Sequence, residues 1–330
     1  MPKIVAGVDS STQSVKVVLR EADSGELIAS TSRPHPDGTE VDPHEWKRAL
    51  DSALDEVSKY KIDAISIGGQ QHGMVALDST GKVIRNALLW NDTRSDQAAH
   101  QLNTEISDIH LRTGSKLVAS FTASKVRWLA DHERENANKV AAIALPHDWL
   151  SWHLSGASSL DTLFTDRSDA SGTGYFDATT NQYCRDIFAT ALRNSKDVTL
   201  PKIVAPHQFG GETPSGIKIA AGAGDNAGAA LGLGAGVGDL VISLGTSGTA
   251  FAVSSTPTHD PSGEVAGFAD ATGNFLPLAC TLNAAKVFST IAKTLNLSFE
   301  DFSSMALQAN PGADGLRFLP HLDGERTPNR

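Results

Sequence analysis

The sequence has few cysteines, no long apolar run, and fewer basic than acidic residues. Its two cysteines, Cys184 and Cys280, lie 96 positions apart, which argues against a disulfide framework or a thiolate zinc site. No apolar stretch reaches the roughly 20 residues of a membrane helix. Met1 is followed at once by a strand-like segment, without the pattern of a signal peptide. We therefore expect a cytoplasmic protein with reduced cysteines and no contact with membranes.

Lysine and arginine together number 28 against 38 acidic residues, so the net charge of the 330-residue chain is -10. A duplex nucleic-acid binder needs a basic face, so nucleic acid is not an expected partner. The same charge repels anionic substrates, which must then be met by local donors or a metal ion. Apolar residues make up 40% of the chain, enough for real cores, and the length favours two domains.

The N-terminal region has the pattern of a mixed α/β domain. Residues 4–9, 15–19 and 26–31 resemble three short strands, and residues 10–13 form a polar turn. Asp42 and Pro43 are a helix start signal. Residues 64–67 resemble a buried strand that ends in glycines. A strand triplet, a helix and a further strand predict an α/β fold.

An internal repeat relates residues 8–19 (VDSSTQSVKVVL) to residues 242–253 (ISLGTSGTAFAV), with Thr12 matching Thr246. Two similar strand–turn–strand units indicate a duplication, with two lobes facing one cleft. We place a first lobe at residues 1–236 and a second at 237–330. The second unit is much shorter, so we expect a complete first lobe and an incomplete second lobe. Exposed apolar surface there would favour association or disorder near the C-terminus.

The two turns are candidate phosphate-binding sites, because backbone N–H groups and small hydroxyls form anion-binding concavities. Asp9 ends the first strand. It either caps its own turn or, with a phosphate nearby, orients hydrated magnesium. The candidate phosphate-binding residues are Ser11, Thr12 and Gln13 in the first turn and Gly245, Thr246, Ser247 and Gly248 in the second.

Asp225 follows a strand-like segment at the start of a small-residue helix. It is either a helix N-cap or a base that accepts a proton from a substrate hydroxyl, and one position can serve both roles. Polar residues at other strand ends could bind a polyol. Taken alone, His72 is more often a structural histidine and Trp90 a core aromatic. The candidate sugar-binding residues are Gln70, Gln71, His72, Trp90, Asn91, Asp92, Arg94 and Asn226.

These segments, among them GVDSSTQSVKVVL, GGQQHGMVALD, LLWNDTRSDQ, AGAGDNAGAALGLG and SLGTSGTAFAV, resemble the FGGY carbohydrate kinases in order and over nearly the whole chain. Among these kinases, the chain is most similar to those acting on D-xylulose. The resemblance implies an actin-like, duplicated ribonuclease-H-type α/β fold, with sugar in the first lobe and ATP between the lobes. It implies magnesium-dependent transfer of phosphate from ATP to D-xylulose, giving D-xylulose 5-phosphate. Asp225 matches the catalytic base, and Asp9 matches the magnesium-associated acid.

Two departures keep alternatives open. Gln71 precedes His72 where bacterial members often have methionine, so a sibling kinase acting on ribulose, another pentulose or glycerol is an alternative. The resemblance places the family's adenosine-binding segment beyond Arg330, so a sugar-binding module without kinase activity is the second alternative. The expected partners are a ketose and ATP, and the quaternary-structure hypothesis is a homodimer.

Overall fold

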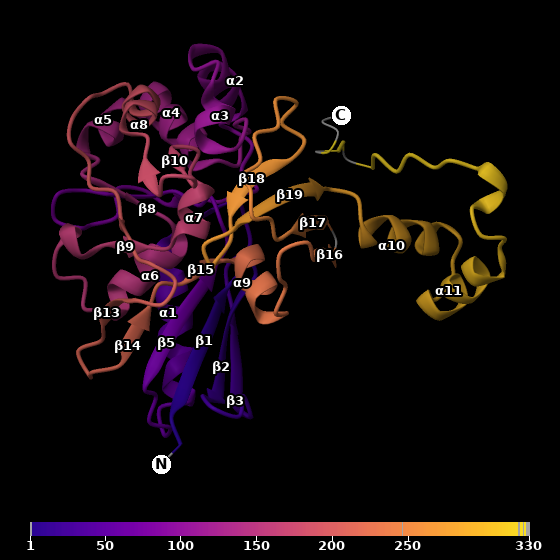
Figure 1. The fold of residues 1–330 in the computed structure, drawn as a ribbon, viewed down its shortest axis with the longest axis horizontal. Coiled ribbons are helices and arrows are strands. Elements are labelled where there is room, and N and C mark those ends of the chain that lie inside the picture. Colours follow the sequence, from indigo (N-terminus) through magenta and orange to yellow (C-terminus); the bar gives the residue numbers. More distant parts are fainter. Residues whose placement is uncertain (1, 246, 323, 326, 328–330) are drawn as a thin grey trace.

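The computed structural model describes residues 2–245, 247–322, 324–325 and 327 (Figure 1). Thr246, one of the predicted phosphate-binding residues, lies outside these described residues. Within them, no helix is both long enough and apolar enough to span a membrane.

The first lobe is built on a mixed seven-stranded sheet with strand order β13-β14-β5-β1-β2-β3, in which β15 also pairs with β5. β1, β2 and β3 are antiparallel, whereas β5 runs parallel to β1 and β14 and β15 run parallel to β5. The three predicted N-terminal strands are therefore confirmed. The strands are β1 Ile4–Ser10, β2 Ser14–Glu21, β3 Leu27–Pro34, β5 Ala64–Gly69, β13 Phe209–Glu212, β14 Lys218–Ala220 and β15 Ala223–Gly224.

Helix α1 (Pro43–Glu56) begins where the sequence predicted. Pro43 is its first residue, and the Asp42 side chain accepts a hydrogen bond from the backbone N–H of His44, as an N-cap does. Trp46 and Leu50 are buried on its inner face, where α1 packs on β2 and β3. The remaining first-lobe helices are α2 Asp96–Glu105, α3 Ile109–Thr113, α4 Thr122–His132, α5 Arg134–Lys139, α6 Pro146–Leu154, η1 Leu160–Thr162, α7 Arg167–Ser171, α8 Arg185–Leu192 and α9 Asp225–Gly232.

A second, four-stranded antiparallel sheet has the order β16-β17-β19-β18. Its first hairpin repeats the β1–β2 hairpin: at the predicted shift of 234 residues, the end of β1 at Ser10 matches the end of β16 at Leu244, and the start of β2 at Ser14 matches the start of β17 at Gly248. The duplicated, actin-like plan is confirmed. The strands are β16 Leu240–Leu244, β17 Gly248–Ala252, β18 Ala266–Ala269 and β19 Phe275–Thr281.

Four short two-stranded ladders complete the sheet structure of the first lobe. Three of their strands, β8, β9 and β10, are labelled among the helices beside the central sheet in Figure 1. They pair β4 Glu40–Val41 with β7 Ala87–Leu88, β6 Val75–Leu77 with β8 Ala142–Ala144, β9 Phe164–Thr165 with β12 Lys202–Ile203, and β10 Phe176–Asp177 with β11 Gln182–Tyr183.

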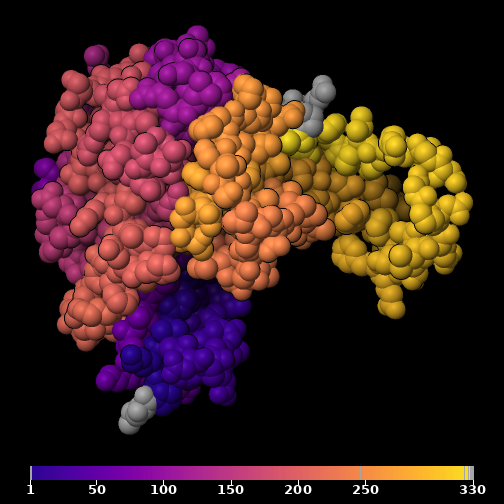
Figure 2. All heavy atoms as spheres, in the orientation of Figure 1, coloured from indigo at the N-terminus to yellow at the C-terminus, as the bar shows by residue number. Residues whose placement is uncertain are grey.

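The last helices, α10 (Ala285–Thr294) and α11 (Phe299–Gln308), extend away from the body, and the short η2 turn (Ala313–Gly315) follows them (Figures 1 and 2). No residue of α11 is buried. Large apolar side chains are exposed on β16 and on these helices, as the sequence predicted for the second lobe. They include Leu240, Ile242, Leu244, Phe288, Phe299, Met305 and Leu307.

Candidate active site

Three strand ends bring the main candidate residues together. In the parallel register of β1 and β5, Asp9 lies opposite Gly68, so the segment that begins at Gln70 leaves the sheet beside the end of β1. β15 pairs with β5 on its other side, with Gly224 opposite Gly69. Asp225 therefore starts α9 at this same edge. The carboxyl ends of adjacent parallel strands are the usual place for a ligand in an α/β sheet.

Gln71 and His72 are held by the loop and helix α7 that follow β9. The Gln71 side-chain amide donates to the Ser168 carbonyl at 3.0 Å, and the His72 ring nitrogen Nδ1 lies 2.6 Å from the Gly172 carbonyl oxygen. The His72 ring also packs against the rings of Phe121 and Phe268 at centroid distances of 4.8 and 5.6 Å. These contacts fit a hydrogen-bonded structural histidine, and its part in sugar binding stays a prediction.

A second group of candidates meets at the turn between β1 and β2. The indole N–H of Trp90 donates to the Thr12 hydroxyl at 2.8 Å, and that hydroxyl lies 3.4 Å from Gln70 Oε1. The buried amide nitrogen of Gln70 and the buried side-chain oxygen of Asn91 have no hydrogen-bond partner among the described protein atoms. Buried polar atoms are rarely left unpaired, so both are available to a sugar hydroxyl or a water.

Asp92 and Arg94 bind mainly each other and the segment around β4. Asp92 Oδ1 accepts from the backbone N–H and Nε of Arg94 at 3.1 and 2.8 Å, and Asp92 Oδ2 accepts from the Thr39 hydroxyl at 2.8 Å. Burial opposes ionisation, but the hydrogen bonds from Arg94 and Thr39 outweigh it and lower the pKa of Asp92. Arg94 also pairs with Glu40 at 2.8 Å. Their role as sugar contacts stays a prediction.

Asp225 is the first residue of α9, and Gly224 is the N-cap. The N-cap interpretation of Asp225 is therefore wrong: the strand continues through Gly224, and Asp225 Oδ1 accepts from the adjacent Asn226, from its backbone N–H at 2.7 Å and from Nδ2 at 2.9 Å. Asn226 Oδ1 in turn accepts from the Thr249 hydroxyl of β17 at 3.3 Å. The adjacent residues Asp225 and Asn226 thus lie where the first sheet and the second sheet meet.

The Asp225 side chain is reached by solvent but has dense protein around it. Desolvation by this surrounding protein, with a smaller contribution from the negative charge of Asp9, raises the pKa of Asp225 to about 6. A carboxylate with such a pKa is deprotonated at neutral pH and is a better proton acceptor than an ordinary aspartate. Its electrostatic interaction with Asp9 places both acids in one region of the molecule.

The first turn uses some of its own donors. The backbone N–H and the hydroxyl of Ser11 both donate to the Ser14 carbonyl at 3.0 Å, and the Gln13 carbonyl accepts from the His35 backbone at 2.8 Å. In the second turn, Gly245 donates to the Ser247 carbonyl at 3.0 Å, and Gly248 already belongs to β17. The phosphate-binding roles of both turns stay predictions.

Asp9 fits a water-coordinated magnesium ion. Its side chain is exposed, and desolvation raises its pKa despite opposing effects of Lys16 and His35. Magnesium prefers one or two carboxylates together with several waters. A single exposed carboxylate beside a predicted phosphate-binding turn meets that preference without further protein ligands, and the magnesium role of Asp9 stays a prediction.

A buried ionisable cluster that the sequence did not predict lies behind these residues and consists of His147, Asp148, Asp166 and Asp169. The adjacent His–Asp pair in PHDW and the two acids of TDRSD are visible in the sequence. Nothing in their spacing shows that α6 and α7 bring them together, because that contact is purely tertiary.

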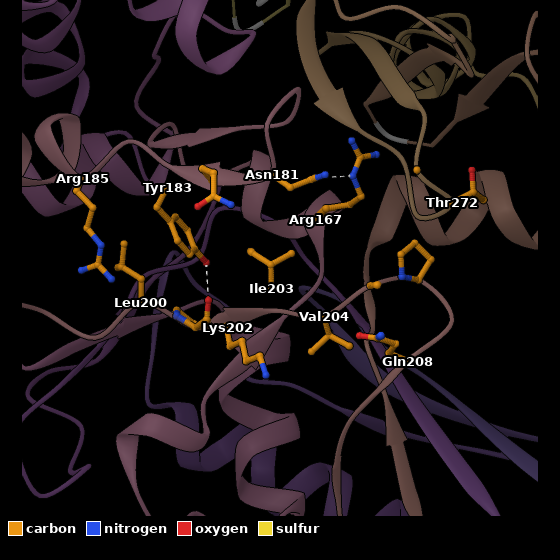
Figure 3. A pocket seen from close by; sticks show the side chains of 15 residues that line it. Arg167, Asn181, Tyr183, Arg185, Leu200, Lys202, Ile203, Val204, Gln208 and Thr272 are labelled. Carbon is orange, nitrogen blue, oxygen red and sulfur yellow. Dashed lines mark hydrogen bonds between the residues drawn. The ribbon is translucent and has the colours of Figure 1, made fainter.

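Figure 3 shows a separate cavity of about 580 Å³ that none of the predicted site residues lines. Positive charge in this cavity comes from Arg167, Arg185 and Lys202. Arg167, however, donates a hydrogen bond to the Asn181 side chain at 3.0 Å and forms an ion pair with Asp270 at 3.4 Å. Its guanidinium group is thus already bonded. Most of the cavity lining comes from residues 181–185 and 200–208, with Thr272 and Gly273 of the β18–β19 turn at one side.

The fold is that of a family of carbohydrate kinases. The N-terminal domain of the FGGY family of carbohydrate kinases matches residues 4–236, and the chain belongs to this family. The kinases of this family use ATP.

Several relatives share this fold over the whole chain. The chain is 44% identical to a xylulose kinase of Streptomyces coelicolor over 343 aligned positions, which cover 99% of the chain and 68% of that relative. The xylulose kinase of Escherichia coli is 33% identical over 98% of the chain and 70% of its own length. The solved xylulose kinase of Bifidobacterium adolescentis superimposes with a TM-score of 0.93 at 42% identity, covering 100% of this chain and 74% of that one.

Proposed function

We propose that this protein phosphorylates D-xylulose to D-xylulose 5-phosphate at the expense of ATP. The observation that carries the proposal is the Asp225 carboxylate, whose pKa is raised to about 6, at the same sheet edge as the segment from Gln70 to His72. A base beside a polyol-binding segment is what phosphoryl transfer to an alcohol requires. The similarity to proteins named xylulose kinase supports the choice of sugar.

In the proposed reaction, Asp225 accepts the proton of the C5 hydroxyl, whose oxygen forms a bond to the γ-phosphorus while the bond to the β-phosphate oxygen breaks and ADP leaves. Asp9 would hold magnesium through water, and the ion would offset phosphate charge. Gln70 and Asn91, each with one buried polar atom that has no partner among the described residues, would orient sugar hydroxyls. We retain the two-lobe division at residue 236, a cytoplasmic location and a homodimer as parts of this proposal.

The test is a coupled assay of ADP release with and without D-xylulose, together with calorimetric binding of D-xylulose. Asp225→Ala should abolish sugar-dependent ADP release while sugar binding persists. The variant removes the proposed base and leaves the side-chain amides of Gln70 and Asn91 in place. Asp161→Ala, an exposed acid on the short helix η1, is the matched control and should behave as the unaltered protein. Near-normal turnover in Asp225→Ala would refute the assignment.

A sibling kinase is the second candidate. The solved gluconate kinase of Lactobacillus acidophilus superimposes with a TM-score of 0.90 at 25% identity, covering 99% of this chain and 70% of that one. Relative turnover on D-xylulose, D-ribulose, glycerol and gluconate separates these substrates. Sugar binding without sugar-dependent ADP release would instead favour a sugar-binding module without kinase activity.

A further inference from the structure

The buried cluster behind the sugar site concentrates four ionisable groups around one histidine ring. His147 Nε2 lies 3.1 Å from Asp169 Oδ2, 3.3 Å from Asp166 Oδ1 and 3.5 Å from Asp148 Oδ1. His147 and Asp148 are neighbours on α6, whereas Asp169 belongs to α7 and Asp166 is the N-cap of α7. None of the four side chains is more than 5% exposed.

Three carboxylates cannot all stay ionised in so small a dry space without a positive charge. Burial alone would lower the pKa of His147, but the negative charges of Asp169, Asp148 and Asp166 outweigh it and raise the pKa to about 10. Burial raises the pKa of Asp169 well above its ordinary value. Asp166 accepts hydrogen bonds from the backbone N–H groups of residues 168 and 169, so its carboxyl group is fixed at the start of α7.

The cluster is joined to the sugar site through α7. Ser168 lies between Asp166 and Asp169 in the sequence. Its carbonyl oxygen accepts a hydrogen bond from the Gln71 side-chain amide, and its hydroxyl oxygen accepts one from the backbone N–H of Gly224, each at 3.0 Å. Gly224 directly precedes Asp225. One residue of α7 therefore contacts both the predicted sugar-binding segment and the end of β15 that directly precedes the candidate base.

His147 also packs against the backbone segments that lead to Gln70 and to Asp225. A Cβ atom at Gly69 would lie 3.0 Å from the His147 Cβ, and one at Gly222 would lie 3.0 Å from the His147 ring. Gly69 ends β5 just before Gln70, and Gly222 precedes β15. His147 thus lies against both segments, with its Cβ beside Gly69 and its ring beside Gly222, while ring atom Nε2 faces Asp166 and Asp169.

We propose that His147 is a positioning residue which, as an imidazolium, holds α7 against the ends of β5 and β15 so that Gln71 and Asp225 face one sugar. It acts through Asp166, Asp169 and Ser168 and touches no substrate. The part of this proposal that concerns alignment of a sugar rests on the proposed function. The positive charge of the His147 ring and its effect on the order of α7 do not depend on that function.

A divalent cation is the competing explanation, because His147, Asp148 and Asp169 offer ligand atoms that lie within 4.8 Å of one another. A metal would take the lone pair of Nε2 and keep the ring neutral. An imidazolium instead donates a proton towards the carboxylates. The protonation state of the ring therefore distinguishes the two.

The first measurement is the NMR signal of the His147 ring nitrogens in the unaltered, sugar-free protein. We expect both to carry protons at about pH 8, where an unperturbed histidine is neutral. Metal analysis of the same sample should find no stoichiometric divalent ion. A neutral ring at this pH, or a bound ion in equal amount to protein, would overturn the proposal.

The second measurement compares three variants. His147→Lys keeps a positive charge at this position, and His147→Gln removes it. The double variant His147→Gln/Asp169→Asn removes that charge together with one carboxylate. In His147→Gln, hydrogen exchange should accelerate at residues 166–172 and 222–226, and kcat/KM for D-xylulose should fall about 100-fold, the cost of a misplacement near 1 Å. His147→Lys and the double variant should recover most of both losses.

Thermal unfolding of each variant separates positioning from stability. Equal exchange and equal kcat/KM in His147→Gln and the unaltered protein would refute the proposal. So would losses that follow the unfolding temperature alone, with the double variant no better than the single. If the unaltered protein does not act on D-xylulose, the proposed function fails, while the NMR and exchange results still decide the role of His147.

Discussion

The raised pKa of Asp225 predicts the acid limb of the pH–activity profile. Only the carboxylate form can accept the sugar proton, so activity is lost as the pH falls through the pKa of about 6. At about pH 7 roughly nine tenths of the side chains are deprotonated, and at about pH 5 roughly one tenth. We therefore expect kcat/KM for D-xylulose to fall about tenfold across this interval.

An ordinary aspartate would give a different profile. With the usual pKa of about 3.9 it would stay ionised over the whole interval, and the rate would be nearly constant. The assay is kcat/KM by coupled ADP release, with calorimetric sugar binding measured at the same pH values as the control. Binding should change little, because the Gln71 amide and the unpaired Gln70 nitrogen do not titrate.

Asp225→Asn completes the test. The amide keeps the shape of the carboxylate and cannot accept the proton, so we expect a loss of about 10²- to 10⁴-fold in kcat/KM and no acid limb in the residual activity. A flat profile for the unaltered protein, or an unchanged limb in Asp225→Asn, would show that another group is the base.

Three further predictions concern stability and exposure. Gly222→Ala should lower the free energy of unfolding in chemical denaturation by about 1–3 kcal/mol. The reason is that φ at Gly222 is +89° and the new Cβ would lie 2.7 Å from the Ile67 carbonyl oxygen. An unchanged free energy of unfolding would contradict this prediction. Trp46→Ala should cost about 3–5 kcal/mol, since Trp46 is fully buried, and Trp46→Phe should cost less. Limited proteolysis should cut first within α10 and α11, and uniform resistance of the chain would count against their exposed position.

Local signals made the N-terminal half predictable. Asp42 and Pro43 mark the start of α1 because a cap and a fixed φ act within one turn. The hairpin repeat was predictable because strand alternation and turn residues are encoded side by side. Of the two alternatives for Asp225, the N-cap is wrong, because Gly224 at the end of β15 takes that position. Which backbone group caps a helix depends on where the preceding strand ends, and that is set by pairing with β5.

Tertiary contacts made the rest unpredictable. No periodicity shows that His147 of one helix meets Asp169 of another, because four ionisable residues in a dry site contradict the usual distribution of charge. The link between Asn226 and Thr249 joins residues on either side of the predicted lobe boundary. The sequence pointed to polar residues at the strand ends, whose roles stay predictions, but not to the buried charges behind them.

Helix α7 explains why the second sheet cannot be treated as independent of the first lobe. The Ser171 hydroxyl accepts from the backbone N–H of Ala269 at 3.0 Å, Arg167 pairs with Asp270, and Gly267 donates to the Gly114 carbonyl at 2.9 Å. Breaking such buried bonds costs about 1–3 kcal/mol for each group left unpaired. The β18–β19 hairpin is therefore bound to α7 and to the end of α3. Any closing motion of the second sheet has to be taken up nearer β16 and α10, where no comparable set of buried polar bonds to the first lobe is found among the described residues.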